Sequence, residues 1–174
     1  MNPRPWHARY GSIPTEIDAD AYPSVVAMLE AAMVTFADRP AFKCFGQTLS
    51  YADVDRLSRH FAAYLQSRLG VRKGDRIALM TPNLMAFPIA FLGIARAGAV
   101  QVNVNPLYTP RELAHQLRDA GAEILIVFNG VSATVADVLS TPDAPPLVKT
   151  VLTISPGDGT TAALPSPPVD ARLQ

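Results

Sequence analysis

The sequence predicts an α/β fold, with a mainly parallel, doubly wound sheet that carries helices on both faces. From residue 76 onward, strand-like apolar runs alternate with segments of helical periodicity, and the connections between them are short. Two of these runs, at residues 77–80 and 124–128, are apolar without interruption, which is typical of strands buried on both faces. A β-α-β series of this kind predicts parallel strands joined by right-handed crossovers.

The first part of the chain predicts two helices separated by a hairpin. Ser24 is positioned to cap a helix that runs to about residue 36, because apolar residues recur there at helical spacing. Residues 41–45 and 48–50 are expected to form two short strands about a turn at residues 46–47. Ser50 is the next expected N-cap, and its helix carries one apolar stripe and ends at Gly70.

The rest of the chain supplies the sheet and its covering helices. Asn83 is expected to cap a helix at residues 84–97, and Thr109 to cap a helix at residues 110–120 that Gly121 closes. A last helix is expected near residues 132–139, and strands at residues 76–80, 100–105, 123–128 and 148–154. Proline, glycine and small residues dominate after residue 154. We therefore assign residues 1–154 to one α/β subdomain and residues 155–174 to a linker or frayed tail.

The strand at residues 100–105 differs from the others because one of its faces is polar. Valines occupy one face, and Gln101, Asn103 and Asn105 occupy the other. The polar face is therefore in water, in contact with polar partners, or at the edge of the sheet. Thr109 and Glu112 then have the spacing of a capping box. Ligands of doubly wound sheets bind beyond the carboxyl ends of strands, and residues 105–108 lie there, although most such turns are structural.

Composition excludes several classes of function. The 15 basic and 15 acidic residues balance, which argues against a nucleic-acid binder. Cys44 is the only cysteine, so an intrachain disulfide is excluded and a cytoplasmic location is expected. The longest apolar stretch, residues 84–95, is shorter than the roughly 20 residues that a membrane span needs, so no transmembrane segment is expected. The three histidines lie far apart in the sequence, and no metal site is expected.

Three stretches together resemble the N-terminal portion of bacterial long-chain fatty acyl-CoA synthetases, which are AMP-forming ligases of the adenylate-forming superfamily. They read LSYADVDRLSRHFAAYLQ, GVRKGDRIALMTPNLMAFPIAFLGIARAGAVQVNVNPLYTPREL and LRDAGAEILIV. The resemblance extends over residues 6–154, and NVNPLYTPREL narrows it toward the long-chain enzymes. It implies the first α/β subdomain of an enzyme that joins a fatty carboxylate to ATP and then transfers the acyl group to coenzyme A.

The resemblance also implies which parts of the chemistry lie elsewhere. ATP, Mg²⁺ and coenzyme A are the cofactors it implies for the full-length enzyme. The family's phosphate loop ends in Pro-Lys-Gly, whereas Gly159-Thr160-Thr161 is followed by neither the glycine nor the lysine. The magnesium-binding glutamate and the catalytic lysine belong to later parts of the family's chain. We therefore expect no catalytic residue here, no tight cofactor binding, and no acyl-adenylate formation by these 174 residues alone.

The resemblance places one loop, formed by Asn105, Pro106, Leu107 and Tyr108, near the coenzyme A nucleotide. The partners that it implies are the remaining ligase domains and a long-chain fatty acid, with peripheral membrane association open to the full-length enzyme. The alternative is a non-catalytic module of the same fold that self-associates as a homodimer. The apolar segment at residues 24–36 or the polar-faced strand would then form the contact.

Overall fold

The structure is a computed structural model that describes residues 4–141, 148–161 and 163–174. Its helices are α1 (Val25–Thr35), α2 (Tyr51–Arg68), α3 (Ala86–Arg96), α4 (Pro110–Ala120) and α5 (Ser132–Leu139), with short 3₁₀ segments η1 (Pro5–Arg9), η2 (Asn129–Val131) and η3 (Ala171–Leu173). Its strands are β1 (Pro40–Cys44), β2 (Gln47–Ser50), β3 (Arg76–Met80), β4 (Val100–Asn103), β5 (Ile124–Phe128) and β6 (Thr150–Ile154).

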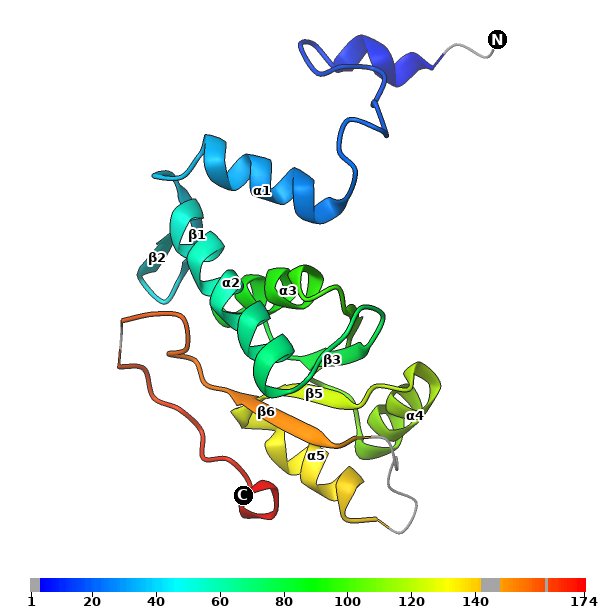
Figure 1. Cartoon of the computed structure of the whole chain (residues 1–174), viewed down its shortest axis with the longest axis vertical. Coiled ribbons are helices and arrows are strands. Elements are labelled where there is room, and N and C mark those ends of the chain that lie inside the picture. The colour runs from blue at the N-terminus through cyan, green and yellow to red at the C-terminus, as the bar shows by residue number, and fades with distance from the viewer. Residues whose placement is uncertain (1–3, 142–147, 162) are drawn as a thin grey trace.

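A four-stranded parallel sheet of order β4-β3-β5-β6 forms the centre of the molecule (Figure 1). Helices α2 and α3 cover one face of this sheet, and α4 and α5 cover the other. The hairpin of β1 and β2 and helix α1 pack against α2. The predicted α/β fold, with a parallel sheet between two helical layers, is therefore confirmed.

The order of the strands creates a switch point between β3 and β5. The chain passes from β3 through α3 to β4, and then returns through α4 to pair β5 with the opposite side of β3. The helices that follow β3 and β5 consequently lie on opposite faces of the sheet. A crevice outside the carboxyl ends of two such strands is where doubly wound proteins bind ligands.

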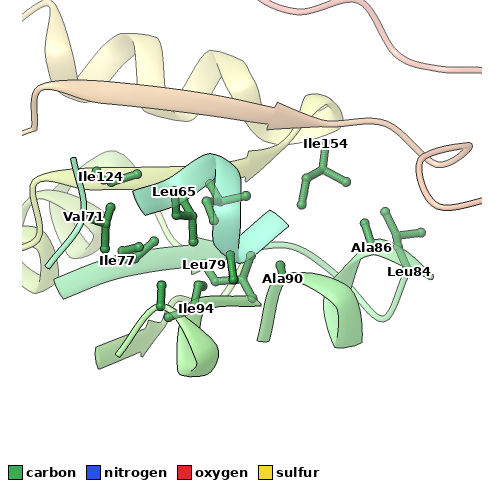
Figure 2. Packing of buried hydrophobic residues seen from close by; sticks show 13 residues of the cluster. Leu65, Val71, Ile77, Leu79, Leu84, Ala86, Ala90, Ile94, Ile124 and Ile154 are labelled. Carbon is green, nitrogen blue, oxygen red and sulfur yellow. The ribbon is translucent and has the colours of Figure 1, made fainter. Parts of the chain in front are cut away.

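Alternating residues of the central strands feed two apolar cores. Ile77 and Leu79 of β3 face α2 and α3, where Leu65 and Ile94 have no exposed surface. Figure 2 shows these four side chains within one buried cluster beside the central strands. Ala78 and Met80 of β3 face α4 and α5 instead. Strands buried on both faces explain why their sequences are apolar throughout.

Most predicted element ends are confirmed by cap geometry. The hydroxyls of Ser24, Ser50 and Thr109 each accept a hydrogen bond from a backbone N–H in the first turn of the helix that follows. Gly121 ends α4 with a left-handed φ of 62°, a conformation that costs glycine little. Three strands are shorter than predicted: β4 ends at Asn103, β5 begins at Ile124 and β6 begins at Thr150.

The predicted cap at Asn83 is wrong. Helix α3 begins at Ala86, three residues later, and no side chain caps its first turn. The side chains of Leu84 and Met85 are instead buried at 8% and 2% exposure, and the carbonyl oxygen of Asn83 accepts a long contact from the Cys44 thiol at 3.8 Å. Packing of these apolar residues therefore fixes the helix start in place of a polar cap.

Arg96, the only charged residue of α3, ties three helices together. Its side chain is 6% exposed. One guanidinium nitrogen donates to the backbone oxygen of Asp55 at 2.8 Å and to the hydroxyl of Ser58 at 2.6 Å. The other contacts the carboxylates of Asp55 and of Glu30, the latter at 3.2 Å. Because Glu30 lies on α1 and Asp55 on α2, this ion-pair network holds both helices against α3.

The Arg96 network makes stability depend on pH through Asp55. Desolvation raises the pKa of the Asp55 carboxyl, but hydrogen bonds from Arg59 and Arg96 and their positive charges outweigh it, so the pKa lies below its usual 3.8. A carboxyl with a lowered pKa stabilises the fold above the unfolded-state value and loses that contribution as the pH falls through the folded-state value. We expect the urea midpoint to fall more between about pH 5 and about pH 3 in the unmodified chain than in Asp55→Asn. Equal falls of the urea midpoint in the two proteins would show that Asp55 does not cause the pH dependence.

Candidate functional site

The loop at residues 105–108 leaves the carboxyl end of edge strand β4 and leads directly into α4. Within it, the side-chain oxygen of Asn105 accepts from the backbone N–H of Leu107 at 3.0 Å, and Tyr108 N–H donates to the Asn105 carbonyl at 3.1 Å. Tyr108 packs on the core beneath α4 and α5, whereas Leu107 is 86% exposed. The loop is thus a closed turn that presents Leu107 outward.

The polar face of β4 is explained by its position at the edge of the sheet, which was one of the three alternatives. The side-chain oxygen of Asn103 accepts from the amide nitrogen of Gln101 at 2.7 Å. Its backbone oxygen accepts from the amide nitrogen of Gln116 on α4 at 2.8 Å. Asn103 and Asn105 thus make their contacts locally, whereas the side-chain oxygens of Gln101 and Gln116 are buried without a partner among the described residues.

The cap at the start of α4 is built as predicted. Glu112 N–H donates to the Thr109 hydroxyl at 3.4 Å, and Thr109 N–H donates to the Glu112 carboxylate at 2.8 Å. The backbone hydrogen bond from Thr109, followed by the bond from its hydroxyl, lowers the pKa of the Glu112 carboxyl. The negative charge of Glu112 therefore already stands at the positive end of the α4 dipole.

Two polar residues at the switch point were not found from the sequence. Thr81 follows β3 and Asn129 follows β5, and both are buried, at 7% and 9% exposure. The Asn129 amide nitrogen donates to the Ser166 hydroxyl at 3.0 Å, while its side-chain oxygen is buried without a partner among the described residues. The sequence signal for each residue is a polar side chain directly after a buried strand. Only the strand order shows that Thr81 and Asn129 follow neighbouring strands.

The segment at residues 163–174 lies over this end of the sheet. Asp170 N–H donates to the Ser132 hydroxyl at the start of α5 at 3.0 Å, and Arg172 pairs with Asp137 of α5 at 2.8 Å. Hydrogen bonds from Arg172, first from its side chain and then from its backbone, lower the pKa of Asp170 to about 2. These contacts hold Asp170 and Arg172 against α5. The assignment of residues 155–174 to a linker or frayed tail stays a prediction.

Three polar residues of the turn at residues 155–161 form hydrogen bonds within it, whereas the Thr161 hydroxyl donates to the Gln47 side-chain oxygen at 3.3 Å. The Asp158 carboxylate accepts from the N–H and the hydroxyl of Ser155, at 2.8 and 2.7 Å. The Thr160 hydroxyl donates to the Gly157 carbonyl at 2.8 Å. Within the described ranges, no three His, Cys, Asp or Glu side chains gather in a way that could hold a metal ion. None of the helices described there is long and apolar enough to cross a membrane.

Comparison with known proteins shows to which family the chain belongs. The family model described as "AMP-binding enzyme" matches residues 29–171. The chain belongs to the AMP-binding enzyme family. The long-chain-fatty-acid–CoA ligase of Escherichia coli O6:H1 is 49% identical over 135 residues, which make up 77% of this chain and 24% of that protein. The ligase of the same name from Bacillus subtilis is 35% identical over 72% of this chain and 22% of its own length.

Further matches include a ligase named for a different acid and two solved structures. The 4-coumarate–CoA ligase 5 of Oryza sativa is 40% identical over 61% of this chain and 20% of its own length. Among solved structures, a fatty acyl CoA synthetase of Mycobacterium tuberculosis superposes with a TM-score of 0.70 at 27% identity, covering 74% of this chain and 26% of that one. A long-chain-fatty-acid–CoA ligase of Archaeoglobus fulgidus gives 0.67 at 26% identity, over 76% and 28%. This chain thus spans about a quarter of the length of the curated family members that it matches.

Proposed function

We propose that this chain is the first α/β part of an ATP-dependent ligase that activates long-chain fatty acids as acyl-adenylates and transfers them to coenzyme A. The observation that carries the proposal is the 49% identity over 135 residues with a long-chain-fatty-acid–CoA ligase. The 4-coumarate–CoA ligase matches less of the chain, and at lower identity, than the Escherichia coli ligase does. This difference favours a fatty acid over an aromatic acid. The parallel sheet has its switch point between β3 and β5, which supports binding at the carboxyl ends of these strands.

The part that these residues play is structural and positional. ATP, Mg²⁺ and coenzyme A would be held mainly by the remaining domains of the ligase, because no group that could stabilise phosphate charge is evident at the described turn of residues 155–161. The long-chain fatty acid is the substrate of the whole enzyme. We place the enzyme in the cytoplasm, with peripheral association at the inner face of the membrane.

The proposal includes the statement that these 174 residues do not form acyl-adenylate by themselves. Incubation with ATP, Mg²⁺ and palmitate should release pyrophosphate no faster than a blank without protein. A ligase that contains the whole family sequence serves as the positive control in the same assay. Release well above the blank by the purified 174-residue chain would show that this statement is wrong.

Within the ligase, we propose that residues 105–108 lie beside the nucleotide of coenzyme A. Leu107 is the residue to test, because its 86% exposure means that Leu107→Ala leaves the core untouched. Loss of a contact worth about 1.4 kcal/mol would raise the apparent KM for coenzyme A roughly tenfold, and adenylate formation would stay unchanged. Val34→Ala, at an 82% exposed position on α1, is the matched control. An equal loss in both half-reactions for Leu107→Ala would argue for a folding role.

A second candidate function, self-association, is favoured by the surface of α1. Val25 and Met28, which lie one turn apart on this helix, are 59% and 44% exposed, and apolar side chains exposed next to each other can mark a contact surface. We expect light scattering after gel filtration to show dimers of the 174-residue chain, and Val25→Lys with Met28→Lys to shift them to monomers. If the unmodified chain is monomeric at high concentration, self-association is not its function.

A further inference from the structure

A hollow of about 270 Å³ opens at the amino ends of β3, β5 and β6, beside the C-terminal ends of α2 and α4. Doubly wound sheets bind their ligands at the opposite end. In Figure 2, Val71 and Ile124, which also line this amino-end hollow, lie at the end of the buried cluster away from Ala86 and Ile154. Four charged side chains line the hollow, those of Asp75, Arg76, Glu123 and Lys149.

Strand pairing brings three of these charges into a row. The register places Ile124 opposite both Ile77 and Thr150. The residues directly before these three, which stand side by side at the amino ends of the strands, are Arg76, Glu123 and Lys149. Lys149 pairs with the Glu123 carboxylate at 2.8 Å, so these two charges compensate each other and Arg76 is left at the end of the row.

The other two charges stay open to a ligand. The Arg76 side chain forms no ion pair or hydrogen bond with any residue in the part of the chain that the structure describes. One of its guanidinium nitrogens lies 4.0 Å from where a Cβ of residue 121 would be, so glycine leaves space beside it. The Asp75 carboxylate accepts the backbone N–H of Arg72 through Oδ2 at 2.7 Å, and its Oδ1 atom has no partner among the described residues.

One open cation and one open anion in the same hollow select the charge of the ligand. A simple anion would be attracted by Arg76 and repelled by Asp75, and a simple cation would meet the reverse. A molecule that carries both charges gains from both side chains. Its carboxylate matches the planar fork of a guanidinium, which binds carboxylates through two parallel hydrogen bonds, and its ammonium group can donate to the Asp75 carboxylate.

We propose that the amino-end hollow binds a small zwitterion, a molecule with one carboxylate and one ammonium group such as a free amino acid. The volume agrees with this class: at roughly 30 Å³ for each non-hydrogen atom, the share of a water molecule, the hollow takes a molecule of at most about nine such atoms. Arg76 holds the carboxylate and Asp75 holds the ammonium group. This site lies at the other end of the sheet from the proposed ligase chemistry, and it does not depend on that reaction.

The test is a titration of the 174-residue chain at pH 7, followed by the amide signals of Gly70, Gly74 and Gly121, which line the hollow. The zwitterions glycine, β-alanine and 4-aminobutyrate offer three spacings of the two charges, and acetate and methylammonium carry one charge each. The best zwitterion should bind about fivefold more tightly than either single-charge probe, the gain from one additional exposed ion pair. Acetate or methylammonium binding as tightly as the best zwitterion, or no change of these signals with any probe, would overturn the proposal.

Two substitutions separate the two charges. Arg76→Gln should abolish the preference for the zwitterion and weaken acetate binding. Asp75→Asn keeps an oxygen that can accept the Arg72 N–H, and should also abolish the preference, but acetate should bind at least as tightly as before. Arg111→Gln, at an exposed arginine outside the hollow, is the matched control and should change neither. Opposite effects on acetate cannot come from a loss of folding. A preference for the zwitterion that survives in either Arg76→Gln or Asp75→Asn would overturn the proposal.

Discussion

Replacing Arg96 by methionine is expected to lower the free energy of unfolding by about 3 kcal/mol. The guanidinium is 6% exposed, and its removal leaves Asp55 and Glu30, at 30% and 37% exposure, without their buried partner. Because both carboxylates can still reach water, the cost should lie at the low end of values for broken buried ion pairs. Chemical denaturation of the variant and of the unmodified chain, monitored by circular dichroism, gives the difference directly.

The matched control for Arg96→Met is Arg59→Met. Arg59 also pairs with Asp55 and Glu30, at 3.0 and 3.3 Å, but its side chain is 57% exposed. Exposed pairs contribute about 0–1 kcal/mol, so this variant should stay close to the unmodified chain. A cost for Arg96→Met no greater than that for Arg59→Met would show that burial of the guanidinium does not matter.

Replacing Gly93 by valine is expected to cost about 3 kcal/mol, the upper part of the range for overpacked cores. Gly93 is buried in α3, and a Cβ added there would lie 2.6 Å from the Phe61 Cδ1 atom and 3.2 Å from the Ser58 carbonyl oxygen on α2. Glycine therefore permits the close contact of α2 and α3, although it disfavours helix formation by about 1 kcal/mol relative to alanine.

The clash predicted at Gly93 can be tested by a double-mutant cycle. In a Phe61→Leu background, which removes the ring, Gly93→Val should cost at least about 1 kcal/mol less than in the unmodified chain. The same unfolding measurement serves for all four proteins. Strictly additive costs would mean that the ring is not what excludes the larger side chain.

Local sequence patterns predicted most of the fold because they report on local physics. The capping box at Thr109 and Glu112 and the glycine at residue 121 specify both ends of α4 without help from the rest of the chain. Asn83 failed as a cap because buried apolar packing decided where α3 begins, and packing is not visible in a local pattern. The end of β4 and the starts of β5 and β6 were also missed, because pairing with a neighbour determines which residues a strand includes.

The candidate site was predicted less completely than the fold. Residues 105–108 form the turn between β4 and α4, and their place beside coenzyme A stays a prediction. Asn129 was missed because its importance depends on β5 pairing beside β3, which no single strand reveals. Arg96 could have been found, since a lone charge in an apolar helix must either reach water or find partners.

The most direct test of the ligase assignment is a chimera. Residues 29–171 of this chain, the range that matches the family, would replace the corresponding part of the Escherichia coli long-chain-fatty-acid–CoA ligase. We predict that the purified chimera forms palmitoyl-CoA from palmitate, ATP and coenzyme A within about tenfold of the parent rate, a loss of at most about 1.4 kcal/mol in the barrier. A chimera that folds but forms neither acyl-adenylate nor acyl-CoA would contradict the account.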